Sequence, residues 1–117
     1  MEIIKEKNVK AIEDLCGPLK ELYKSENVSL ANVVIKAGGE AHLHKHPELE
    51  EVYYVLSGRG KMRIGDDIYN IKKGDTFAIY PKDTPHKAMN PYKKDMKILV
   101  VCYPKFDISL LEDLEKS

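Results

Sequence analysis

The sequence of 117 residues contains no Trp, only two Cys and no excess of charge of either sign. Nineteen Lys and Arg residues balance nineteen Asp and Glu residues, so the formal net charge is zero. A neutral chain offers no overall basic field to attract a nucleic acid, and we expect no nucleic-acid partner. Cys16 and Cys102 are too few for a disulfide framework, so both are predicted to be free thiols, buried or half-buried.

Long hydrophobic runs are also missing. The apolar runs are much shorter than the ~20 residues that a membrane-spanning helix needs, and the N-terminal residues lack the apolar core of a signal peptide. The sequence therefore predicts no membrane partner and a cytoplasmic location. A chain of 117 residues has room for one hydrophobic core, so we expect a single domain over residues 1–117.

Three of the four histidines stand at alternate positions in one short stretch: His42, His44 and His46. Successive side chains of an extended strand point to opposite faces, so these three rings would share a face. Glu50 and Glu51 follow shortly after, beyond a proline that favours a bend. Neutral imidazoles and carboxylates are ligands for borderline divalent metals. The stretch therefore predicts a metal site, which the distant His86 would complete if the fold brings it back.

Two spaced motifs resemble the signatures of the cupin family. The first runs from Gly38 to Gly58 in the pattern Gly-x5-His-x-His-x4-Glu-x6-Gly. The second runs from Gly74 to Asn90, with six residues between its Gly and Pro where the family usually has five, and with Asp83 where a glycine is common. Aspartate tolerates a left-handed backbone better than most residues, so the turn is expected to survive.

The resemblance implies an all-β fold, the cupin double-stranded β-helix or jelly-roll barrel, in which the two motifs are hairpins that converge in the barrel mouth. It implies one divalent metal ion (Fe, Mn, Ni, Co or Zn) held by four residues: His44, His46, Glu51 and His86. In this pattern His42 takes a position at the rim or in support of the ligands. Glu50 then faces the other way from Glu51.

Alternating apolar residues separated by Gly and Pro turns are, on pattern alone, typical of a sandwich or jelly-roll barrel. The barrel core is expected at about residues 19–104, with strands at 28–37, 51–56, 61–64, 68–71, 76–80 and 96–103, and one starting at His86. Residues 19–24 fit a helical turn or a strand, and the resemblance favours the strand. Apolar residues at helical spacing predict short flanking helices over 9–16 and 107–116.

The resemblance implies a metal-dependent enzyme acting on a small molecule, either a dioxygenase or an isomerase of the sugar-phosphate (mannose-6-phosphate) type. The alternative is a non-catalytic module that binds a small ligand or is only stabilised by its metal. Tyr53 or His42 would be the base of an isomerase. Lys61 and Arg63 would hold an anionic substrate if they face inward, although solvation of both is the simpler expectation. An apolar outward face at Val52, Tyr54 and Leu56, together with family habit, predicts a homodimer.

Overall fold

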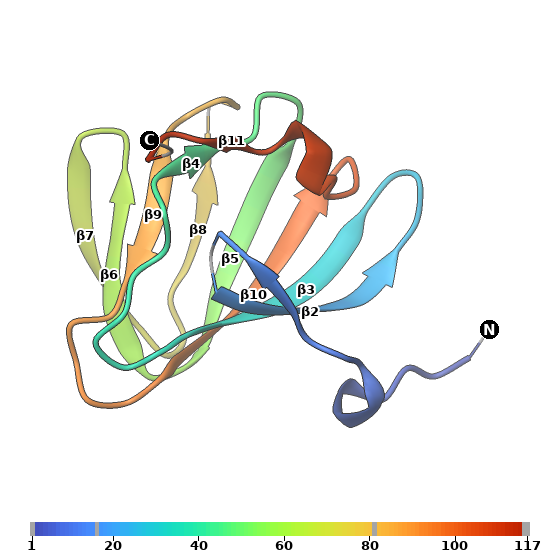
Figure 1. The fold of residues 1–117 in the computed structure, drawn as a ribbon, viewed down its shortest axis with the longest axis horizontal. Coiled ribbons are helices and arrows are strands. Elements are labelled where there is room, and N and C mark those ends of the chain that lie inside the picture. The colour runs from blue at the N-terminus through green and yellow to red at the C-terminus, as the bar shows by residue number, and fades with distance from the viewer. Residues whose placement is uncertain (1, 16, 81, 116–117) are drawn as a thin grey trace.

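Two antiparallel β-sheets stack face to face in the computed structural model, which describes residues 2–15, 17–80 and 82–115 (Figure 1). Within these residues, one sheet has the strand order β1-β2-β3-β10-β5-β8 and the other has the order β11-β4-β9-β6-β7. The strands are β1 (Ile12–Asp14), β2 (Gly17–Lys24), β3 (Ser29–Ile35), β4 (His44–Lys45), β5 (Glu50–Ser57), β6 (Arg59–Ile64), β7 (Asp67–Lys72), β8 (Thr76–Ile79), β9 (His86–Met89), β10 (Met96–Tyr103) and β11 (Glu112–Asp113). The all-β architecture that the sequence predicts is confirmed.

Strand β10 shows how the alternating pattern builds the core between the sheets. It lies between β3 and β5, and its residues Met96, Ile98, Val100 and Cys102 are all buried. The residues between them face outward, so β10 is fully buried on one face and half-buried on the other. Burial raises the pKa of the Cys102 thiol to about 12. Cys102 is thus a buried free thiol as predicted, whereas Cys16 lies outside the described residues.

Two turns have backbone conformations that constrain the sequence. Gly58, between β5 and β6, has φ +79°, and a Cβ there would lie 2.5 Å from the carbonyl oxygen of Asp95. Among the described non-glycine residues, only Asp83 has a positive φ, at 72°. Asp83 therefore adopts the left-handed conformation expected of the glycine that it replaces in the second motif. The loop that contains it delivers His86 to the start of β9, as predicted.

The predicted N-terminal helix over residues 9–16 is wrong. The chain forms only a 3-10 turn, η1 (Glu6–Asn8), and then the short strand β1, which pairs with β2 through Ile12 opposite Leu19 and Asp14 opposite Gly17. A helix this short is marginal in water, whereas an added edge strand satisfies its backbone groups on the sheet. Helical spacing of a few apolar residues was therefore a weak guide here.

The predicted C-terminal helix over residues 107–116 is also wrong. Its described part contains a 3-10 turn, η2 (Ile108–Leu110), followed by β11, which pairs with β4 and sets Asp113 opposite His44. β4 would otherwise be an unpaired edge, so pairing with β11 satisfies backbone groups that a helix would leave open. Across the described residues, no helix has the length and apolar character needed to cross a membrane.

Candidate metal centre

Both sheets contribute to a buried cluster of three histidines and one glutamate. His44 begins β4, His46 follows this strand, His86 begins β9, and Glu51 lies on β5 of the opposite sheet. β4 pairs with β9 through His44 opposite His86, which brings together residues that are far apart in the sequence. The four residues are between 1% and 4% exposed, and one nitrogen from each histidine lies within 4.8 Å of the others.

Backbone carbonyls fix two of the imidazole rings. Nδ1 of His44 lies 2.6 Å from the carbonyl oxygen of His42, and Nδ1 of His86 lies 2.8 Å from that of Thr84. A carbonyl oxygen only accepts hydrogen bonds, so Nδ1 carries a proton in both rings and Nε2 is the nitrogen left to face the cluster. The same residue spacing, i to i−2, orients both rings. This is the arrangement that presents an imidazole nitrogen to a metal.

The Glu51 carboxylate faces two of these rings. Its Oε2 lies 2.8 Å from Nε2 of His86, and its Oε1 lies 3.4 Å from Nε2 of His46. Although Oε2 and the His86 nitrogen are close, neither is in hydrogen-bond geometry with any partner in the described residues. A carboxylate oxygen and an imidazole nitrogen this close in a buried site are unfavourable without a cation or a proton between them. The donor set and these two atoms therefore fit a divalent metal ion.

The protonation states suit the same role. Burial lowers the pKa of His44 to about 4, and burial also lowers the pKa of His46. Burial alone would raise the pKa of Glu51, but the three neighbouring imidazoles, His86 first, bring it below its ordinary value. At neutral pH the cluster therefore holds uncharged imidazoles at His44 and His46 beside an ionised carboxylate, which is the form that binds metal.

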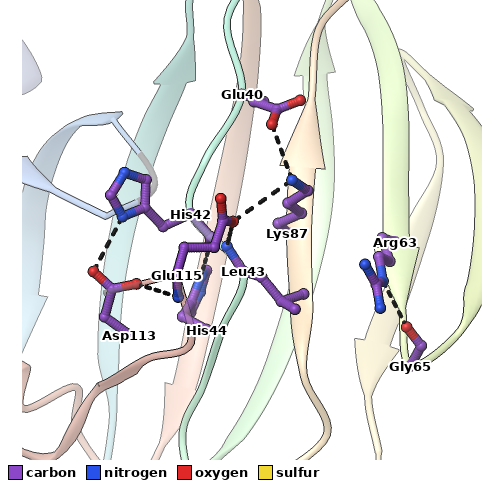
Figure 2. Close-up of polar contacts among 9 residues, drawn as sticks. All are labelled: Glu40, His42, Leu43, His44, Arg63, Gly65, Lys87, Asp113 and Glu115. Atoms are coloured by element: carbon purple, nitrogen blue, oxygen red, sulfur yellow. Dashed lines mark hydrogen bonds and ion pairs between the residues drawn. The ribbon is translucent and has the colours of Figure 1, made fainter. Parts of the chain in front are cut away.

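The other candidate residues lie outside the cluster or beside it. The His42 ring is exposed and its Nδ1 donates to Oδ2 of Asp113 at 3.1 Å, so only its backbone carbonyl supports the site (Figure 2). Tyr53 is buried, and its hydroxyl donates to Oε1 of Glu51 at 3.3 Å. Glu50 is half-buried on the opposite face of β5 from Glu51. His42 therefore does not face the site as a base would, whereas Tyr53 does.

Lys61 and Arg63 do not reach the cluster. Both alternate on β6 with the inward-facing Met62, Lys61 Nζ donates to Oδ1 of Asn70 at 2.8 Å, and Nε of Arg63 donates to the carbonyl oxygen of Gly65 at 2.9 Å (Figure 2). Each cation is thus bound within its own hairpin. Lys61 and Arg63 would hold an anionic substrate only if they faced inward, and neither does.

Sequence reasoning missed several residues that surround the cluster. Asp14 has a buried Oδ1 without a hydrogen-bond partner among the described residues, and its charge acts on His46. The Phe106 ring meets the His46 ring edge-on, with 5.4 Å between centroids. Asp14 lies in the segment predicted to be the N-terminal helix, and Phe106 directly precedes the segment predicted to be the C-terminal helix. No local pattern therefore indicated that either residue lies near the cluster.

The C-terminal residues 113–115 form polar contacts with the outer side of the stretch that contains His42 and His44. The Glu115 carboxylate accepts a hydrogen bond from the Leu43 amide and lies 3.5 Å from Nζ of Lys87, which also donates to Glu40 at 2.9 Å (Figure 2). Together with the pair of His42 and Asp113, these contacts hold the backbone on either side of Leu43. The carbonyl that orients His44 is therefore held in place by the last described residues of the chain.

Comparison with known proteins identifies the class to which this architecture belongs. The sequence profile of the Cupin domain matches residues 31–102. The uncharacterized protein MJ1618 of Methanocaldococcus jannaschii is 41% identical over 104 residues, which cover 89% of this chain and 81% of that protein. The chain therefore belongs to the cupin family, as the two motifs predict.

Two solved structures share the fold. The polyketide cyclase RemF from Streptomyces resistomycificus superposes with a TM-score of 0.83 at 19% identity, covering 100% of this chain and 87% of that chain. A predicted oxalate decarboxylase from Thermotoga maritima superposes with a TM-score of 0.77 at 21% identity, covering 88% of this chain and 99% of that chain. At these identities the likeness establishes the fold alone.

Proposed function

We propose that this cupin binds one divalent metal ion through His44, His46, His86 and Glu51 and acts as an enzyme on a small molecule. The observation that carries the proposal is the 2.8 Å approach of Oε2 of Glu51 and Nε2 of His86, both buried and neither in hydrogen-bond geometry. A cation among these atoms removes the cost of burying them. Iron, manganese, nickel, cobalt and zinc all accept imidazole and carboxylate ligands.

The protein's own residues prepare this site for chemistry. Three imidazoles and one carboxylate leave one or two positions open on a six-coordinate metal, which would supply Lewis-acid polarisation or a place for dioxygen. The Tyr53 hydroxyl holds Oε1 of Glu51 and keeps a proton next to the cluster. Phe77 stacks on the Tyr53 ring with 5.0 Å between centroids, which shields this side of the cluster from water.

A small, largely apolar substrate fits the surroundings better than a sugar phosphate. A hollow of about 280 Å³ next to β6, β7 and β8 has a mainly apolar lining that includes Met62, Ile64 and Phe77, with three polar residues, Asn70, Asp75 and Thr76. Met62 also lines a cavity of about 10 Å³ that touches His44 and Tyr53, so this side chain stands between the hollow and the cluster. Because Lys61 and Arg63 are bound within their hairpin, dioxygenase-type chemistry is favoured over sugar-phosphate isomerisation.

One observation supports a second candidate, a cupin whose metal only stabilises the fold. The cavity beside His44 has a volume of about 10 Å³, which holds at most a single water molecule. Unless Met62 moves, the metal would be closed off by packed side chains. In that case the ion would join the two sheets through Glu51 on one and the histidines on the other.

We further propose that the functional unit is a homodimer of single-domain chains (residues 1–117) in the cytoplasm. Support comes from the outer face of β5, where Val52 is 41% exposed and Tyr54 is 45% exposed. They stand opposite the half-buried Val101 and Leu99 of β10, so the apolar surface continues across two strands. A contiguous exposed apolar surface of this kind is typical of an interface.

Elemental analysis of protein purified without a chelator or a His tag tests the proposed function. We expect about one metal ion per chain, and none in a variant that carries both His44→Ala and His86→Ala. The matched control is His42→Ala, which removes an exposed imidazole from the same stretch and should keep the metal. Retention of one ion per chain by the double variant would contradict the ligand assignment. Melting in the presence and absence of metal, and oxygen uptake after loading with ferrous iron, then separate an enzyme from a metal-stabilised fold.

A further inference from the structure

A groove lies at the opposite end of the sandwich from the histidine cluster. β5 and β9 both begin at the cluster, with Glu51 and His86, and their far ends lead into the turns that form the groove (Figure 1). The groove has a volume of about 690 Å³. Its lining includes five cationic side chains and one aromatic ring: Arg59, Lys72, Lys73, Lys93, Lys94 and Tyr92. Three separate turns of the chain therefore bring five cations to one hollow.

These cations are not neutralised within the chain. Among the described residues, none of the five side chains forms an ion pair, although lysines elsewhere, such as Lys87 and Lys97, are paired with glutamates. Two carboxylates belong to the same turns, but Asp75 accepts the amide of Lys72 at 2.9 Å and Asp95 accepts the amide of Ala37 at 2.9 Å. Both acids keep their charge while holding the backbone of the turns, and among the described residues neither forms an ion pair with a cation of the groove.

The walls of the groove are built rigidly. The Arg59 guanidinium lies 3.8 Å from the centre of the Tyr92 ring, a cation–π contact that fixes the arginine. The side-chain amide of the buried Asn90 donates to the carbonyl oxygen of Lys94 at 2.7 Å and accepts from the amide of Tyr92 at 3.1 Å. On the opposite wall, the amide of Lys73 donates to the carbonyl oxygen of Gly58 at 2.9 Å and so joins two of the three turns. The Arg59 side chain and the backbone of the groove are thus held in place before a ligand binds.

We propose that this groove binds a small molecule that carries two or more phosphate groups. Guanidinium and ammonium groups are the usual partners of phosphate oxygens, and five of them around one hollow exceed what a single phosphate can use. The volume lies in the range of small-molecule sites. A second hollow of about 320 Å³ shares Arg59, Lys72 and Tyr92, but Asp75 also lines it, so it offers room for an uncharged part of a larger ligand and not for a further phosphate. The site is independent of the proposed metal function.

The test is a titration of the full chain with inorganic pyrophosphate and, separately, with inorganic monophosphate. Calorimetry measures the affinity, and amide NMR locates the binding site. We expect saturable binding of pyrophosphate at least tenfold tighter than that of monophosphate. Amide shifts should appear at Gly58, Lys73 and Tyr92, not at His44 or His86. A variant with both Arg59→Gln and Lys94→Gln should bind at least tenfold more weakly. The control, with both Lys5→Gln and Lys10→Gln, loses the same charge from exposed positions outside the groove and should bind as the wild type does.

Three results would overturn the proposal. Equal weakening by the control variant would mean that pyrophosphate responds only to total charge. Shifts confined to the histidine cluster would place the ligand on the metal site. Binding of a single-stranded oligonucleotide or a poly-glutamate peptide at these residues without saturable binding of pyrophosphate would make the groove a contact for a macromolecule.

Discussion

Replacement of Glu51 by Gln tests the metal centre most directly, because the change preserves the shape of the side chain and removes its charge. Glu51 is 3% exposed, and its two carboxylate oxygens lie 2.8 Å from Nε2 of His86 and 3.4 Å from Nε2 of His46. A cation held among these atoms would lose its one anionic ligand. Breaking a buried charge pair by removing one partner costs about 3 to 5 kcal/mol. With about 1.4 kcal/mol for each factor of ten, metal affinity should fall by about 100-fold to 4,000-fold.

Competition with a chromophoric chelator measures this loss as a ratio of dissociation constants. Glu50→Gln is the matched control, because Glu50 precedes Glu51 on β5 and points to the other face. We expect the control to bind metal within about threefold of the wild type, since the half-buried Glu50 carboxylate points away from the cluster and contributes little to it. Circular dichroism should show that both variants stay folded. Normal affinity in Glu51→Gln together with a loss in Glu50→Gln would refute the assignment and shift the site by one residue.

Three further outcomes are expected. Asp83→Ala should lower the free energy of unfolding by about 1 kcal/mol more than Asp83→Gly, because both lose the contact with Lys45 but only alanine is strained at φ 72°; equal urea midpoints would contradict this. The second concerns Cys102 in a variant whose other cysteine is removed by Cys16→Ser. At pH 8 a thiol reagent should modify Cys102 about 100-fold more slowly in the native protein than in urea, because burial raises its pKa to about 12. Equal rates in the two conditions would refute its burial. Tyr54→Lys should convert a dimer to a monomer in sedimentation, and a monomeric wild type would disprove the proposed interface.

The strands were predictable because their signal is local. On β5 the side chains alternate between the core and the outer face, as its sequence does. On β10 a continuous apolar run predicts a strand buried on both faces, whereas the structure buries one face fully and the other in part. The two helix predictions were wrong because the spacing of a few apolar residues carries no information about sheet edges, and these edges pair with the same segments. β1 and β11 are set by their partners β2 and β4, which lie elsewhere in the sequence. Such tertiary pairing overrides weak local preference.

The four candidate ligands could be named from the sequence because their spacing resembles that of the cupin family, and their role as ligands stays a prediction, whereas the sequence did not indicate their surroundings. His44, His46, Glu51 and His86 have spacings typical of the family, and the structure brings them together. The direction of Lys61 and Arg63 depends on their hairpin, which no spacing reveals.

The basic groove was hidden by the composition itself. A net charge of zero argued against a nucleic-acid partner and drew no attention to these residues, yet the fold gathers five cations from three turns at one end. Local charge density, not the total, decides what a surface attracts.

The side chain of Met62 connects the question of catalysis to the packing of the core. It is 1% exposed and borders both the outer hollow and the small cavity that touches His44. Methionine is unbranched and has three rotatable bonds, so it changes rotamer at lower cost than a β-branched residue in the same place. Met62 is the one residue that lines both the hollow and the small cavity, so rotation of its side chain would connect them without moving the paired strands on either side. If the metal binds as proposed, one flexible side chain separates it from the hollow, which is why we favour the enzyme over the purely structural role.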